Sequence, residues 1–220
     1  MVQFKSYDDI GVSTEGHVAT IEIQRPPHNF FDYSLIQQIA DAMETIDEDK
    51  NLRCVVLCAQ GKSFCAGANF GSDGSSANRS QENNPTDKSS HLYVEAVRLF
   101  ATKTPIVGAI QGAAIGGGLG LSLVPDFRVA CPESRFAANF TRLGFHPGFG
   151  LTHTLPALIG NQRATLMFYT SRRIKGEEAY EWGLADMLVP LEEVRTAATD
   201  LAKEISENSP LGVMETRATM

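Results

Sequence analysis

The chain has 220 residues, of which 43% are hydrophobic and 20% charged, and its formal net charge is −7. This length and composition suit one globular domain with a core of its own. The negative charge, with no basic stripe to offset it, argues against a nucleic-acid-binding protein. The first residues form no secretory signal and no apolar run approaches the ~20 residues of a membrane span, so we expect a cytoplasmic protein.

The first half of the chain alternates strand and helix patterns. Short apolar runs bounded by prolines or polar residues indicate strands, whereas apolar residues at helical spacing indicate helices. The predicted elements are a strand at 18–23, a helix capped by Asp32 and extending to Ile46, a strand at 54–59, a surface loop at 71–90, a helix at 92–100 and a strand after Pro105.

The second half continues the alternation. Strands that alternate with helices favour an α/β domain with parallel pairing. The predicted elements are a glycine-rich turn and apolar helix at 112–124, strands at 127–131 and 135–138, helices at 152–159, 163–169 and 176–182, a strand at 187–189 and a helix at 191–205.

Four cysteines are spread over this pattern. They show no metal-ligand spacing, and Cys54 and Cys58 both fall on a predicted strand. We therefore expect buried, reduced thiols and no metal site.

Five glycines between Gly112 and Gly120 form the most informative stretch. Such a turn can present backbone N–H groups at a helix start to a phosphate or to an oxyanion. The spacing matches neither the dinucleotide fingerprint nor the Walker phosphate loop. Glycines used only for close packing are the alternative, but three in a row, Gly116 to Gly118, exceed what packing is expected to need.

A second turn, Ser63-Phe-Cys-Ala-Gly-Ala-Asn69, precedes the glycine-rich one. Together the two turns resemble the signature of the crotonase superfamily, the enoyl-CoA hydratase/isomerase proteins, and the segments 25–29 and 125–128 match its pattern too. The resemblance implies a spiral of ββα turns followed by C-terminal helices that complete a homotrimer, often a dimer of trimers. We expect the acyl-CoA-binding core at 1–190 and the start of the C-terminal helical region at 191–220. Because the family usually continues further, this region is expected to be either truncated or short.

The resemblance also implies site residues. The N–H groups of Ala68 and Gly117 would donate to the thioester oxygen of an acyl-CoA, where enolate charge develops. Arg25 and Lys62 could meet the CoA phosphates, although a solvated surface charge is the alternative for each. The other residues expected at the CoA or substrate site are His28, Phe30, Ala66, Gly67, Asn69, Phe70, Gly116 and Phe140. No cofactor is implied beyond the CoA thioester itself.

Acid/base residues are where this sequence departs from the family. Gly120 and Phe140 stand where hydratases carry two glutamates, and Gly148 stands where related enzymes carry another carboxylate. Ordinary hydration is therefore not expected. His146 is the candidate general base, with a loop histidine bonded to backbone as the alternative.

The helix at 92–100 is expected, from the resemblance, to cover the mouth of the pocket. His91 and Glu95 at its start are expected to lie on a solvated face.

We thus expect an acyl-CoA-binding enzyme that stabilises a thioester enolate. An enzyme of non-hydratase chemistry, an unconventional hydratase or isomerase, and a non-catalytic acyl-CoA-binding or oligomer-partner protein remain as hypotheses.

Overall fold

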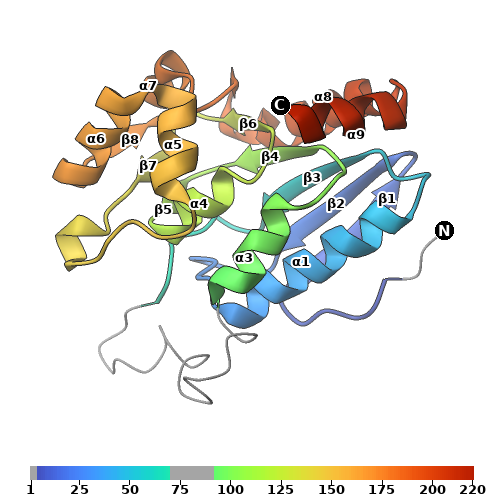
Figure 1. Ribbon diagram of the computed structural model, residues 1–220, viewed down its shortest axis with the longest axis horizontal. Coiled ribbons are helices and arrows are strands. Elements are labelled where there is room, and N and C mark those ends of the chain that lie inside the picture. The colour runs from blue at the N-terminus through green and yellow to red at the C-terminus, as the bar shows by residue number, and fades with distance from the viewer. Residues whose placement is uncertain (1–3, 70–91) are drawn as a thin grey trace.

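The computed structural model describes residues 4–69 and 92–220 (Figure 1). The predicted loop at 71–90, Phe70 and His91 lie outside the described residues. The strands are β1 (Ile10–Glu15), β2 (Val18–Ile23), β3 (Cys54–Ala59), β4 (Ile106–Ile110), β5 (Ala113–Ile115), β6 (Phe127–Ala130), β7 (Arg135–Ala137), β8 (Arg173–Lys175) and β9 (Met187–Leu188). The α-helices are α1 (Tyr33–Glu48), α3 (Leu92–Phe100), α4 (Gly117–Ser122), α5 (Leu151–Ile159), α6 (Asn161–Thr170), α7 (Gly176–Trp182), α8 (Val194–Ser206) and α9 (Pro210–Thr219), and the 3₁₀ turns are η2 (Thr141–Leu143) and η3 (Leu191–Glu193).

The elements predicted in the described part of the chain are present, and three strands were missed. The missed β1 is an edge strand that pairs only with β2, and most of its side chains are partly or fully exposed. The missed β5 and β8 have three residues each, too few to show a period. The predicted helix at 191–205 begins instead with the 3₁₀ turn η3, so α8 starts at Val194.

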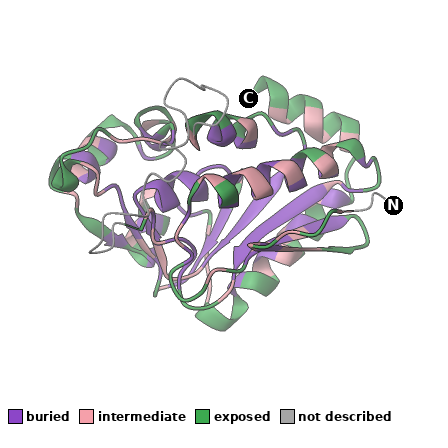
Figure 2. Cartoon of the chain, turned by 90° about the horizontal axis from the view of Figure 1, so that it is seen from below, coloured by how far each residue is buried: buried purple, intermediate pink, exposed green. Residues whose placement is uncertain are grey.

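The main sheet has the order β1-β2-β3-β4-β6-β9, and every pairing except β1–β2 is parallel. Side chains alternate between its faces. On β3, Val55 and Leu57 pack into the core on the α1 side, whereas Cys54 and Val56 pack into the core that Val194 of α8 helps to form. Burial on both faces explains the unbroken apolar run of β3 (Figure 2).

Helix α1 covers the first face of this sheet, and α3 packs beside α1 (Figure 1). Asp32 caps α1 as predicted, because its carboxylate accepts a hydrogen bond of 3.0 Å from the N–H of Leu35. The buried residues of α1 are Leu35, Ile36, Ile39, Ala40, Ala42, Met43 and Ile46. Their spacing produces one apolar stripe against the sheet.

A smaller sheet, β5-β7-β8, lies with α4, α5, α6 and α7 at the other end of the molecule (Figure 1). Cys65 forms a parallel bridge to Ala114 of β5. Its N–H donates to the oxygen of Ala113 at 2.9 Å, and its carbonyl accepts from the N–H of Ile115 at 3.0 Å. This pairing places the two turns singled out in the sequence side by side.

All four cysteines are buried and free, as predicted. Among residues 4–69 and 92–220, no helix is both long and apolar enough to cross a membrane. Within the same residues, no three His, Cys, Asp or Glu side chains come together in a way that could hold a metal ion.

Candidate functional site

The first turn is held by Asn29, which lies before α1. Asn29 is fully buried, and its Nδ2 donates to the carbonyl oxygens of Gln60 (2.8 Å) and Ser63 (2.7 Å). Its Oδ1 accepts from the N–H of Arg25 at 2.9 Å. The backbone of Asn29 has φ 49°, a left-handed conformation that asparagine tolerates better than most residues. The segment 25–29 therefore holds the backbone that leads into the first turn.

Close packing accounts for the glycines of the second turn. A Cβ on Gly112 would lie 1.8 Å from the carbonyl oxygen of Lys62, and one on Gly118 would lie 2.1 Å from that of Cys65. A Cβ on Gly117 would lie 2.2 Å from the ring of Phe31, and Gly116 has φ 58°. The expectation that three glycines exceed the needs of packing is wrong, and the functional argument must rest on the N–H groups.

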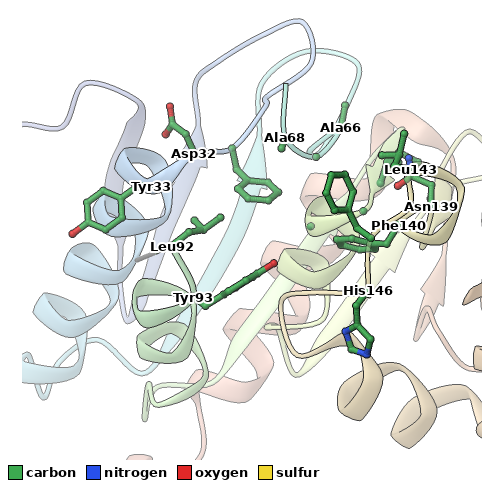
Figure 3. A pocket seen from close by; sticks show the side chains of 16 residues that line it. Asp32, Tyr33, Ala66, Ala68, Leu92, Tyr93, Asn139, Phe140, Leu143 and His146 are labelled. Atoms are coloured by element: carbon green, nitrogen blue, oxygen red, sulfur yellow. The ribbon is translucent and has the colours of Figure 1, made fainter. Parts of the chain in front are cut away.

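A cavity of about 440 Å³ opens between the two turns and α3 (Figure 3). Most of its wall is apolar or aromatic, which is typical of small-molecule sites. The residues that line it are Phe31, Asp32, Tyr33, Ala66, Gly67, Ala68, Leu92, Tyr93, Ile115, Gly116, Gly117, Asn139, Phe140, Leu143, Phe145 and His146.

The backbone N–H groups in this wall are of two kinds, those with a hydrogen-bond partner and those without one among the described residues. The N–H of Ala66 donates to the oxygen of His28 at 2.9 Å, and that of Gly116 donates to Ala137 at 2.8 Å. By contrast, the N–H groups of Ala68 and Gly117 make no hydrogen bond to any described residue. Both residues line the cavity.

The structure brings together seven of the predicted site residues in this cavity: Ala66, Gly67, Ala68, Gly116, Gly117, Phe140 and His146. The other described candidates do not line it. Arg25 forms ion pairs with Asp9 (2.5 Å) and Asp32 (2.9 Å). Lys62 lines a separate cavity, His28 stacks on Phe30 with ring centroids 5.1 Å apart, and Asn69 is exposed.

Helix α3 contributes a residue that sequence reasoning missed. Tyr93 extends from α3 across the cavity toward the segment that carries Phe140 and His146 (Figure 3). The pattern at 92–100 indicated a helix, but no periodicity shows which of its aromatic residues faces a cavity. Sequence reasoning also missed the wall residues Phe31, Leu92, Ile115, Asn139 and Leu143.

Glu95 on the same helix was predicted to lie on a solvated face, and this prediction is wrong. It is 5% exposed and is ion-paired with Arg98, and it accepts a hydrogen bond of 3.3 Å from the hydroxyl of Tyr33. Arg98 also pairs with Asp41 at 2.7 Å and so links α3 to α1. Glu95 therefore helps to fix the helix that carries Tyr93.

The spaces beside two other glycines are filled by aromatic residues. A Cβ on Gly120 would lie 2.6 Å from Cβ of Phe149, and a Cβ on Gly148 would lie 2.1 Å from the hydroxyl oxygen of Tyr93. Side chains at these positions would thus meet aromatic neighbours in the present packing.

The model of the enoyl-CoA hydratase/isomerase family matches residues 13–220. The chain belongs to the enoyl-CoA hydratase/isomerase family. A Bacillus subtilis protein named as an enoyl-CoA hydratase/isomerase, YngF, is 34% identical over 91% of this chain and 76% of its own length. A crotonyl-CoA hydratase of Syntrophomonas wolfei is 30% identical over 97% of this chain and 81% of its own.

Solved structures of enoyl-CoA hydratases agree in fold. One from Geobacillus kaustophilus has a TM-score of 0.85 at 30% identity and covers 96% of this chain and 80% of its own. Another, from Bacillus anthracis, has a TM-score of 0.84 at 31% identity and covers 96% and 81%. The predicted crotonase-like α/β fold with C-terminal helices is confirmed.

Proposed function

We propose that this enoyl-CoA hydratase/isomerase family member binds an acyl-CoA thioester and stabilises its enolate. The observation that carries the proposal is that the N–H groups of Ala68 and Gly117 lie in the wall of one cavity and donate to no described residue. Fixed donors aimed at a developing oxyanion are worth ~10²–10³ in rate each. Such interactions strengthen where the bound acyl group and the apolar wall displace water.

The chemistry proposed is proton transfer at the carbon next to the thioester, and not ordinary hydration. Gly120 and Phe140 provide no carboxylate where the family's hydratases are expected to carry glutamates. Asp32 is the one carboxylate among the described lining residues, and it is engaged in capping α1 and in pairing with Arg25. His146, an exposed residue that lines the cavity, is the proposed general base.

The CoA moiety is proposed to run over the segment 25–30 and the first turn. His28, Phe30 and Asn69 lie there beside the cavity residues Ala66 and Gly67. Lys62 would supply positive charge to phosphates, and Arg25 would do so by leaving its ion pairs with Asp9 and Asp32. Binding is then expected to weaken as the salt concentration rises, because phosphate contacts are screened.

A ligand pair tests the oxyanion donors without mutating glycines whose space is already filled. Calorimetry should compare butyryl-CoA with the thioether S-butyl-CoA, which lacks only the carbonyl oxygen. The thioester is expected to bind more tightly, since only its oxygen can accept from Ala68 and Gly117. Equal affinities would place the acyl group elsewhere, and absence of binding by any CoA ester would reject the site.

The second candidate is a non-catalytic acyl-CoA-binding or oligomer-partner protein, favoured by Gly120, Phe140 and Gly148 at the acid/base positions. It predicts the same binding without exchange of the α-protons of a bound ester in D₂O. His146→Gln should abolish exchange in the enzyme hypothesis and change nothing in this one. The family assembly, a homotrimer or a dimer of trimers, is part of the proposal and is tested by light scattering.

A further inference from the structure

The Tyr93 hydroxyl occupies the space in front of Gly148. An added Cβ there would lie 2.1 Å from the hydroxyl oxygen and 2.9 Å from Cζ of the ring. The tip of Tyr93 therefore stands where a short side chain at position 148 would otherwise project. The hydroxyl thus places a proton-carrying group where related enzymes are expected to carry a carboxylate at position 148.

Tyr93 and His146 are the two titratable residues that line both this cavity and an adjoining one of about 440 Å³, in which Phe149 also takes part. Tyr93 comes from α3, whereas His146 comes from the loop between η2 and α5. A ligand in the first cavity would therefore have two groups able to carry a proton in its wall.

The wall holds two other titratable residues, Asp32 and Tyr33, and each has an ionisable partner outside the cavity wall. Asp32 is paired with Arg25, and the Tyr33 hydroxyl donates to Glu95. Burial raises the pKa of Tyr93 above its ordinary value, so the group is a neutral phenol at pH 7 with a proton to give.

We propose that Tyr93 is a catalytic residue whose hydroxyl delivers a proton to the α-carbon of the thioester enolate, opposite His146. The proposal rests on the function proposed above. Like that function, it assigns the site to acyl groups that carry a hydrogen on the carbon next to the thioester.

The proton balance is as follows. His146 takes a proton from the α-carbon, and the electron pair of that C–H bond forms the enolate, whose oxygen is held by Ala68 and Gly117. The O–H bond of Tyr93 breaks as its proton forms a new C–H bond with the α-carbon, and the carbonyl re-forms. Imidazolium and phenolate then return to their neutral forms by proton transfer through water, so no other reactant is needed.

Exchange in D₂O measures this step directly. Phenylacetyl-CoA is a suitable probe because its ring acidifies the α-protons, and mass spectrometry follows deuterium uptake while calorimetry gives Kd. Wild-type protein is expected to exchange both α-hydrogens, whereas Tyr93→Phe should exchange only the one that His146 removes and returns, with an unchanged Kd. Tyr169→Phe, on the 81% exposed tyrosine of α6, is the matched control and should exchange at the wild-type rate.

Gly148→Ala is a second variant that keeps the hydroxyl but displaces it, because its Cβ would overlap the hydroxyl oxygen. It is expected to lower exchange as Tyr93→Phe does. Wild-type exchange in Tyr93→Phe would overturn the proposal, as would a Kd that weakens in step with the rate, since that shows a packing role. Wild-type protein that binds the ester without exchange would reject the proposed enolate chemistry together with the Tyr93 step and would favour the non-catalytic candidate. Wild-type exchange that persists in Tyr93→Phe would reject the Tyr93 step alone.

Discussion

Asn29 and Ser63 are joined across the buried base of the site by a hydrogen bond of 2.7 Å, from Nδ2 to the carbonyl oxygen. The same amide nitrogen donates to Gln60, so one side chain satisfies two carbonyls of the segment that leads into the first turn. The position of the Ala68 N–H therefore depends on a residue almost forty positions earlier in the chain.

Asn29→Ala should destabilise the fold and weaken acyl-CoA binding together. It leaves the carbonyls of Gln60 and Ser63 and the N–H of Arg25 without their partner, and a buried unsatisfied group costs about 1–3 kcal/mol. Urea unfolding measures the loss of stability. Asn161→Ala, at an exposed asparagine on α6, is the control and should leave stability unchanged.

Gly120→Ala should destabilise the protein although alanine is the better helix former. Its Cβ would lie 2.6 Å from Cβ of Phe149, and such overpacking costs about 1–3 kcal/mol. In a Phe149→Ala background the cost of the same substitution should shrink, which a double-mutant cycle measures.

A helical glycine with free space is the matched control. In Gly212→Ala, on α9, the new Cβ would meet its nearest atoms at 3.6 Å, an ordinary contact. Its stability should stay the same or rise. An equal loss at Gly120 and Gly212 would contradict the packing argument.

Crotonyl-CoA should bind without efficient hydration. General acid and base groups are worth ~10²–10⁴-fold each, and Gly120 and Phe140 supply neither. Loss of enoyl absorbance at high protein concentration is the assay. Phe140→Glu should raise the rate, and Phe140→Gln, of similar shape but uncharged, should not.

Brisk hydration by the unsubstituted protein would contradict this expectation. His146→Gln would then show whether the imidazole had taken over activation of the water.

The buried cysteines predict a loss of stability at alkaline pH. Burial raises the pKa of Cys54 to about 12, of Cys58 to about 11 and of Cys65 to about 12. An unfolded thiol titrates near ~8.5, so above that pH the unfolded chain binds fewer protons than the folded one. The free energy of unfolding in urea should hold steady up to about pH 8 and fall as pH rises toward the folded-state values.

Thiol reagents give an independent check on the same cysteines. The native protein should react slowly at pH 8, whereas the unfolded chain should react at once, because only the thiolate attacks. Cys58→Ala should make the alkaline loss of stability shallower. A slope that does not change would show that other groups cause it.

Local patterns determined much of this fold. The apolar run at 54–59 predicted the strand β3, and the helical spacing after the Asp32 cap predicted α1. The two turns were recognised from residue identities alone, because close backbone contact, as between Gly118 and Cys65, requires small residues. They supplied five residues of the cavity wall, and the family resemblance pointed to two more, Phe140 and His146.

Tertiary packing decided the rest. Glu95 and Tyr93 lie two positions apart on one short helix, yet one is buried in an ion pair with Arg98 and the other extends across the cavity. Nothing local distinguishes them, because their surroundings come from α1 and from the loop around Gly148, which are remote in sequence. Whether a glycine marks a ligand, a turn or a neighbouring ring is likewise fixed by what packs against it, and that neighbour is known only once the chain has folded.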